Sequence, residues 1–188
     1  NDSLSPVEDE DEDPGYIVSM EDYCALSESE KISYRSHHYD EPSLATRHLD
    51  YNNDGYQDIY IANDGHPNSL FENNDGLFVN NALIQSVAYS GNGRSQAGMG
   101  LAIGDYNNDG LFDLFVTNFA QDYNTLYENS GKGYFSDVSG RAGLGASSRP
   151  FMGLGTFFFD ADKDGWEDIF VANGHLMPDI DKDGVSLK

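Results

Sequence analysis

Side chains that carry oxygen recur three times in this chain at one fixed spacing. The stretch from Asp105 to Asp113 reads DYNNDGLFD, and it returns as DYNNDGYQD at 50–58 and as DADKDGWED at 160–168. Positions one, three, five and nine of each stretch carry a side-chain oxygen, position six is glycine, and position seven offers its backbone carbonyl. Calcium takes roughly six to eight oxygen ligands and fits such a set best.

The three stretches therefore predict about three bound calcium ions. Zinc and copper favour histidine or cysteine, which none of the loops contains, and magnesium keeps more of its own water. The predicted ligands are Asp50, Asn52, Asp54, Tyr56 and Asp58 in the first loop, Asp105, Asn107, Asp109, Leu111 and Asp113 in the second, and Asp160, Asp162, Asp164, Trp166 and Asp168 in the third.

Two other interpretations of the loops explain less. Asn-Asp-Gly favours a tight turn, but a turn does not account for the aspartates at both the first and the ninth position. An EF-hand requires a bidentate glutamate at position twelve and a helix on each side. Position twelve is Ile61, Val116 or Val171, and the residues after each loop alternate as strands do. Each metal is thus expected in a turn between strands.

The spacing of the loops predicts a repeat fold. Asp50, Asp105 and Asp160 are each 55 residues apart. In the second unit, strands are expected at 101–104, 114–117, 124–129 and 134–138, and the first unit repeats the last two at 68–73 and 77–79. Four antiparallel strands per unit are typical of a β-propeller blade. We expect an all-β partial propeller with blades at 44–98, 99–153 and 154–188, the last incomplete.

Both ends of the chain differ from the repeats. Residues 1–43 include the acidic run from Glu8 to Asp13 and are expected to form an acidic arm or linker. Within them, 16–18 could still pair as a strand. Near the other end, Asp179, Asp181 and Asp183 imitate a fourth loop, but Leu187 stands at its ninth position, so an acidic turn is expected there.

Charge and composition limit the partners and the location. The net charge is −23, with 33 acidic and 10 basic residues, which opposes binding to nucleic acid. No run of apolar residues is long enough to predict a transmembrane helix. The chain begins at Asn1, which suggests a mature or excised product. Calcium outside the cell reaches levels that saturate even weak sites, so an extracellular location is expected. One cysteine gives no internal disulfide.

No set of residues predicts catalysis. His37, His38, His48, His66 and His175 lie in the arm or beside strand ends, and no pairing of a nucleophile with a base stands out. Carboxylates that bind a metal are poor acids and bases. The chain is therefore expected not to be an enzyme. Arg94 and Arg141 receive no role beyond pairing with a neighbouring carboxylate.

Aromatic and glycine residues recur at matching repeat positions, which favours packing between blades over a sugar-stacking platform. The glycines that flank the entering strands are expected to permit close backbone approach. The aromatic set is Tyr60, Phe71, Phe78, Phe115, Tyr127, Phe135, Phe157 and Phe170, and the glycines are Gly98, Gly100, Gly153 and Gly155.

The stretches LDYNNDGYQDIYIAND, GLAIGDYNNDGLFDLFVTNF and FFDADKDGWEDIFVANGH resemble the FG-GAP or VCBS repeats of integrin-α-type propellers. Secreted proteins with an ASPIC/UnbV region, of the cartilage acidic protein class, are especially similar. The resemblance covers about 44–175 and implies a calcium-binding β-propeller of an extracellular or cell-surface protein, with the metal positions given above. Residues 1–43 match nothing in that family, and the ASPIC/UnbV region itself is not in this chain.

These observations favour a calcium-binding extracellular scaffold or adhesion module whose partners are proteins or a cell-surface or matrix ligand. An alternative is a self-assembling structural subunit, in which open blade edges pair with further copies of the same chain to form a ring or filament. An enzyme built on a propeller is the least favoured of the three.

Overall fold

The computed structural model describes residues 43–131 and 134–174, so the predicted acidic arm and the fourth loop-like stretch lie outside the described residues, except for Ser43. The described residues form three antiparallel sheets and one short helix. The first sheet contains β1 (Ser43–Leu49), β2 (Asp58–Asn63), β3 (Ser69–Asn74) and β4 (Leu77–Asn80). The second contains β5 (Gly98–Gly104), β6 (Asp113–Asn118), β7 (Thr125–Asn129) and β8 (Phe135–Asp137), followed by helix α3 (Leu144–Ser147). The third contains β9 (Gly153–Phe159) and β10 (Asp168–Asn173).

Each complete sheet is a simple meander, with its strands hydrogen-bonded in chain order. This confirms the all-β fold with blades of four antiparallel strands. The register places every predicted metal loop at the same point. The last residue of the entering strand pairs with the ninth loop residue, as Leu49 with Asp58, Gly104 with Asp113, and Phe159 with Asp168.

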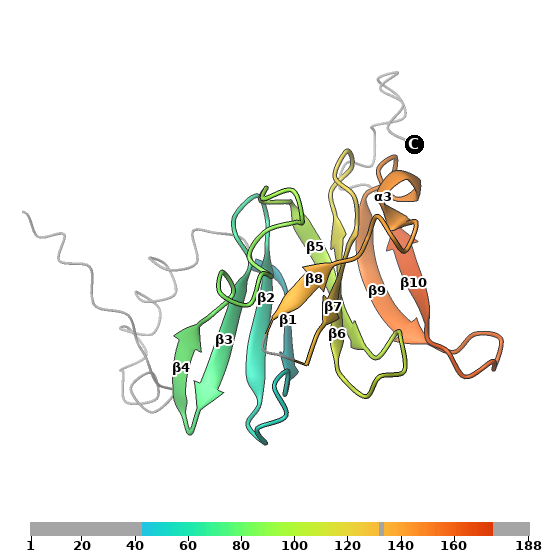
Figure 1. Ribbon diagram of the computed structural model, residues 1–188. Coiled ribbons are helices and arrows are strands. Elements are labelled where there is room, and N and C mark those ends of the chain that lie inside the picture. Colours follow the sequence, from blue (N-terminus) through green and yellow to red (C-terminus); the bar gives the residue numbers. More distant parts are fainter. Residues whose placement is uncertain (1–42, 132–133, 175–188) are drawn as a thin grey trace, which may run out of the picture.

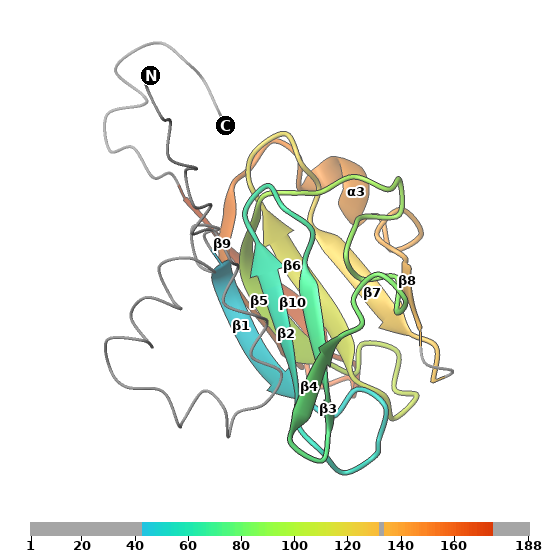
Figure 2. The same cartoon turned by 90° about the vertical axis from the view of Figure 1, so that its left-hand side faces the viewer.

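The sheets are arranged like spokes of a wheel. Their first strands β1, β5 and β9 contact one another in sequence, and Figure 2 shows these strands along one side of the molecule with the later strands extending away from them. All three metal loops lie at the lower end in Figure 1, and α3 lies at the opposite end. One end of the partial propeller therefore holds the acidic loops, and the other holds the connections between blades.

Two hydrophobic cores fill the spaces between neighbouring sheets. The first lies between the first and second sheets and is built around Tyr60, Leu70, Leu114 and Tyr127. The second joins Phe115 and Leu126 to residues of the third sheet, where the ring of Phe115 meets the edge of Phe158. Strand β6 contributes to both cores and is buried along its whole length. Both faces of the middle sheet are therefore covered by a neighbouring sheet.

The outer face of the third sheet corrects one prediction from the sequence. Phe115 is 1% exposed, whereas Phe170, at the matching repeat position, is 44% exposed. Phe157 is also exposed, and its ring stacks on that of Phe170 with centroids 4.9 Å apart. The prediction of a buried inter-blade core was wrong for these two residues, because no further sheet follows β10 among the described residues. Phe71 and Phe78, in the first sheet, are only half-buried.

The glycines of the entering strands confirm the predicted close packing at three of four positions. A Cβ on Gly100 would lie 1.8 Å from the carbonyl oxygen of Leu154 in β9, and this oxygen accepts a hydrogen bond of 3.0 Å from the Thr117 hydroxyl. Gly98 and Gly153 are similarly crowded by the neighbouring sheet. At Gly155 a Cβ would make only an ordinary contact of 3.8 Å.

Gly100 and Gly155 form a matched pair for mutation. Gly100→Ala is expected to destabilise the fold by at least about 1–3 kcal/mol, because the backbone of β9 must move away. Gly155→Ala occupies the same repeat position and is expected to be neutral or to stabilise by up to about 1 kcal/mol, because it restricts the unfolded chain. Denaturant unfolding of both variants checks this. An equal loss of unfolding free energy in the two variants would contradict the packing described here.

Candidate metal centre

The three loops share one set of internal hydrogen bonds. In the second loop, the Asp105 carboxylate accepts the backbone N–H of Asp109 at 3.0 Å and that of Gly110 at 2.8 Å. The Asn107 side-chain oxygen also accepts from Asp109, and the Asp109 carboxylate accepts from Leu111. The first and third loops repeat all four bonds. These bonds orient the oxygens at positions one, three and five toward the turn.

The backbone of each loop explains two of its residue types. Position four has a positive φ in every loop, at Asn53, Asn108 and Lys163. Asparagine tolerates this left-handed conformation better than most residues. Position six also has a positive φ, between 84° and 91°, and is glycine each time. The loops therefore turn in the same way although their sequences differ.

The ninth position anchors the two complete blades. Asp58 and Asp113 are both 0% exposed. One oxygen of Asp113 accepts the N–H of Tyr106 at 3.2 Å, and the other accepts the N–H of Asn129 in β7 at 2.8 Å. Asp58 bonds in the same way to Tyr51 and to Asn73 in β3. One buried carboxylate thus connects the start of the loop to the third strand of its blade.

Burial changes the protonation of these anchoring carboxylates. The pKa of Asp113 is raised to about 7, mainly by desolvation and also by the charges of Asp109 and Asp105, although the two N–H groups oppose the shift. Desolvation likewise raises the pKa of Asp58. No positive side chain of the described residues is among the groups that offset this burial. A cation held by the loop would supply such a positive partner.

The third loop is the most acidic and the most exposed. Oxygens of Asp160, Asp162 and Asp168 lie within 4.8 Å of one another. Asp168 accepts the N–H of Ala161 at 3.0 Å, as in the other loops. The described residues include no third strand in this blade, so the second anchoring bond seen at Asp58 and Asp113 has no counterpart there.

The geometry fits a calcium ion in each loop. The side-chain oxygens predicted as ligands accept hydrogen bonds from backbone N–H groups of the turn, and no lysine or arginine of the described residues forms an ion pair with them. The residues at position seven, Tyr56, Leu111 and Trp166, would contribute only carbonyl oxygens, and their side chains are exposed or half-buried. Carboxylate, amide and carbonyl oxygens together form a donor set that suits calcium.

The structure also joins the second and third loops, which the sequence did not predict. The Glu167 carboxylate accepts the backbone N–H of Asp105 at 2.8 Å, and the Asn108 side chain donates to the carbonyl of Gly165 at 2.8 Å. Glu167 fits because its neighbour Gly104 has no Cβ, which would lie 2.3 Å from the carboxylate. The sequence signal for this contact was Glu167 itself, because the eighth loop position is acidic in the third loop alone.

A second contact that the sequence did not predict joins the loop to the third strand in each complete blade. Tyr51, at the second loop position, donates its hydroxyl to Glu72 at 2.6 Å, and Tyr106 donates to Glu128 in the same manner. Arg141 pairs with Glu128 at 2.6 Å, which confirms that this arginine pairs with a nearby carboxylate. The third loop has alanine at the second position and lacks this contact.

The described histidines take no part in the loops. His48 is exposed on β1, and His66 is exposed with its Nδ1 3.1 Å from the carbonyl oxygen of Asp64. His37, His38 and His175 lie outside the described residues. The absence of enzymatic activity stays a prediction.

Sheets of this kind, with an acidic turn at each entering strand, define a propeller-type repeat protein. The chain matches the FG-GAP-like repeat over residues 50–116 and again over 105–171. It belongs to this family, whose repeats are those of propeller-type interaction or adhesion modules. The match does not extend to the narrower ASPIC/UnbV class, which stays a prediction. No curated protein matches the chain.

Within 43–131 and 134–174, no helix has the length and apolar character needed to cross a bilayer.

The raised pKa of Asp113 predicts a pH effect in the metal-free protein. The pKa of aspartate in an unfolded chain is about 3.9, whereas that of folded Asp113 is about 7. Between these values the folded state holds a proton that the unfolded state has released. Its free energy of unfolding should therefore fall as pH rises from about 4 to about 7, and this contribution should then level off.

Asp113→Asn, which cannot ionise, should reduce that slope. Chemical unfolding in the presence of a chelator, at pH values across this window, measures it for both proteins. Other carboxylates contribute a background that the two proteins share. Parallel stability profiles for the wild type and the variant would contradict the assignment to Asp113.

Proposed function

We propose that this chain is a calcium-stabilised interaction module that works outside the cell. The observation that carries the proposal is the repeated loop, in which several acidic oxygens gather at one turn. In the two complete blades the ninth carboxylate is also buried, and no lysine or arginine pairs with it among the described residues. Such an arrangement is costly in the metal-free state, because the charges repel one another and lose water. A divalent cation removes both costs.

Each loop would hold its ion through the side-chain oxygens at positions one, three, five and nine and the carbonyl at position seven. The ion supplies positive charge and joins the end of one strand to the start of the next. The chain's own hydrogen bonds place the oxygens in advance, so less ordering is needed on binding. In the second and third loops, the contacts of Glu167 and Asn108 would let one site support its neighbour.

An extracellular location follows from the affinity expected of such sites. Exposed loops with mixed carboxylate and amide ligands suit the weak calcium binding of extracellular modules, with Kd values of about 10⁻⁴ to 10⁻³ M. Only there is calcium abundant enough to fill them. The partners proposed are proteins, including a cell-surface or matrix ligand. Ion-bound carboxylates make poor general acids and bases, so a non-catalytic role is proposed.

A second candidate function is that of a structural subunit. The exposed aromatic face of Phe157, Phe159 and Phe170 on the third sheet favours it, because a neighbouring blade would bury that face. The blade could come from the same protein or from another copy of the chain. Both functions use the same folded unit, so one does not exclude the other.

Tryptophan fluorescence offers a direct test of calcium binding. Trp166 is the only tryptophan and occupies position seven of the third loop, where it is 53% exposed. Adding calcium to the chelated chain should change its emission in a saturable manner. Asp160→Asn combined with Asp168→Asn should abolish the change, because two ligands of that loop lose their charge.

The matched control places Asp50→Asn and Asp58→Asn in the first loop. These substitutions should leave the Trp166 response in place, since the first loop does not contact the third. Magnesium at equal concentration should give a smaller response because its shell is more rigid. No response to calcium in the wild-type chain, or the same response in the third-loop variant, would refute calcium binding at this site.

A further inference from the structure

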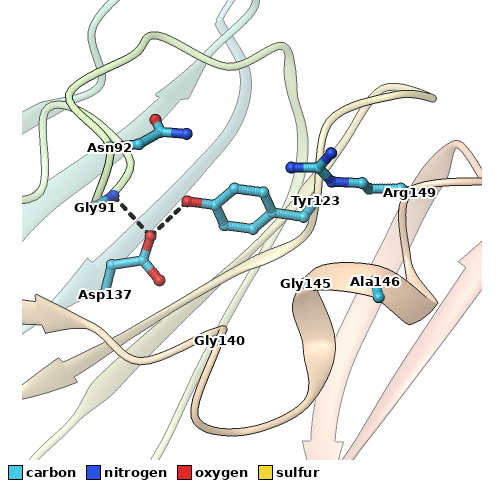
Figure 3. A pocket seen from close by; sticks show the side chains of 8 residues that line it. All are labelled: Gly91, Asn92, Tyr123, Asp137, Gly140, Gly145, Ala146 and Arg149. Carbon is cyan, nitrogen blue, oxygen red and sulfur yellow. Dashed lines mark hydrogen bonds between the residues drawn. The ribbon is translucent and has the colours of Figure 1, made fainter.

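A hollow of about 560 Å³ lies at the end of the molecule opposite the metal loops. It is formed by the connection between the first two sheets, the β6–β7 loop, the end of β8 and the segment around α3 (Figure 3). All of its lining residues belong to the part of the chain that the structure describes, and the hollow is open to solvent. Volumes of about 300–1,000 Å³ are usual for small-molecule sites.

One side of the hollow is held rigid by Asp137. Its carboxylate accepts four hydrogen bonds, from the N–H of Gly91 at 2.7 Å, the hydroxyl of Tyr123 at 2.8 Å, and both the N–H and the hydroxyl of Ser139. Burial alone would raise the pKa of Asp137, but these bonds outweigh it and lower the pKa. Asp137 therefore fixes the Tyr123 ring and has little capacity left for a ligand.

The groups that stay available to a ligand are donors. The Arg149 guanidinium lies 5.8 Å from the centre of the Tyr123 ring and is exposed, and no carboxylate pairs with it among the described residues. The Asn92 side-chain oxygen accepts from the Ser90 hydroxyl at 2.7 Å, which leaves the Asn92 amide N–H groups free to donate. Figure 3 shows Asn92 and Arg149 on either side of the Tyr123 ring.

A smaller hollow of about 90 Å³ adjoins the first and shares Asn92, Tyr123 and Arg149 with it. Arg94 lines this smaller space, so two arginines face connected hollows in a chain of net charge −23. Asp122 is also in its wall and accepts the N–H of Ala97 at 3.3 Å, but forms no ion pair with either arginine. Two arginines that line the same small space and pair with no carboxylate among the described residues suit an anionic ligand.

The shape of the larger hollow indicates what carries the anion. Four of its eight lining residues, Gly91, Gly140, Gly145 and Ala146, contribute no side chain longer than a methyl group. An aromatic ring and several donors beside these small residues suit a sugar ring, whose C–H face packs against an aromatic side chain while its oxygens accept hydrogen bonds. We propose that this hollow binds one carboxylate-bearing sugar unit, a uronate, with its carboxylate on Arg149 and its ring oxygens near Asn92.

The net charge limits how many such units bind. A highly charged polyanion would be repelled by the acidic chain as a whole, so a single uronate within a mainly neutral saccharide fits better. An acidic side chain of a peptide would engage Arg149 equally well, but it would leave most of the ring-sized space empty. The proposal is independent of the metal loops, which lie at the opposite end of the molecule.

Titration of the full chain with glucuronate, followed by NMR or calorimetry in the presence of calcium, tests the site. Saturable binding in the millimolar range is expected. Glucose, which lacks the carboxylate, should bind about tenfold or more weakly, as should glucuronate to Arg149→Gln, because each case loses a charge-assisted hydrogen bond. Arg149→Lys should recover part of the affinity.

Arg141→Gln is the matched control, since Arg141 is exposed and pairs with Glu128 away from the hollow. Its affinity for glucuronate should equal that of the wild type, and circular dichroism should show every variant folded. Absence of binding to the folded wild type would overturn the proposal, as would equal affinity in Arg149→Gln. Binding of an acidic dipeptide in preference to glucuronate, with the same dependence on Arg149, would overturn the sugar assignment.

Discussion

The buried carboxylate at the ninth position of the metal loop is the contact on which each complete blade depends. Asp113 receives one N–H from the start of its own loop and another from the third strand of its sheet. Without the first bond the loop would not close, and without the second the loop would not be fixed to the blade. Asp58 makes the same two contacts in the first sheet. Because this carboxylate is buried, its charge has to be balanced, and the loop that it closes is where a cation would balance it.

The burial of each sheet depends on how many neighbouring sheets it has. The second sheet has neighbours on both sides, and its central strand β6 is fully buried. The third sheet has a neighbour on one side only, so its far face exposes Phe157 and Phe170. Glu167 and Asn108 add polar contacts between the second and third loops, so the interface between blades continues from the apolar core to the metal end. Contacts along this whole interface would keep the blades rigid. The hollow around Tyr123, at the end opposite the metal loops, would then be a stable place for a ligand.

Much of this architecture follows from the sequence, because a repeated motif restricts both the period and the register. The 55-residue spacing and the strand pattern predicted four-stranded sheets, and the structure confirms them. Crowding at Gly100 also follows from the repeat. The burial of Phe157 and Phe170 was predicted wrongly, since burial depends on a neighbouring sheet and not on the residue's own strand. Glu167 and Asp105 are 62 positions apart, and although the acidic residue at the eighth loop position stands out in the sequence, a single sequence does not indicate which residue it contacts. The hollow around Tyr123 could not be predicted either, because it is assembled from connecting segments whose paths depend on tertiary packing.

Calorimetric titration of the metal-stripped chain would show whether the three repeated loops are calcium sites. We expect uptake of about three calcium ions per chain, one for each loop, because all three loops share the same oxygen spacing and the same hydrogen bonds. Conversion of both the first and the ninth aspartate of one loop to asparagine should reduce the number of bound ions by one. A folded chain that takes up no calcium, or whose uptake does not change when a loop loses these aspartates, would contradict this assignment.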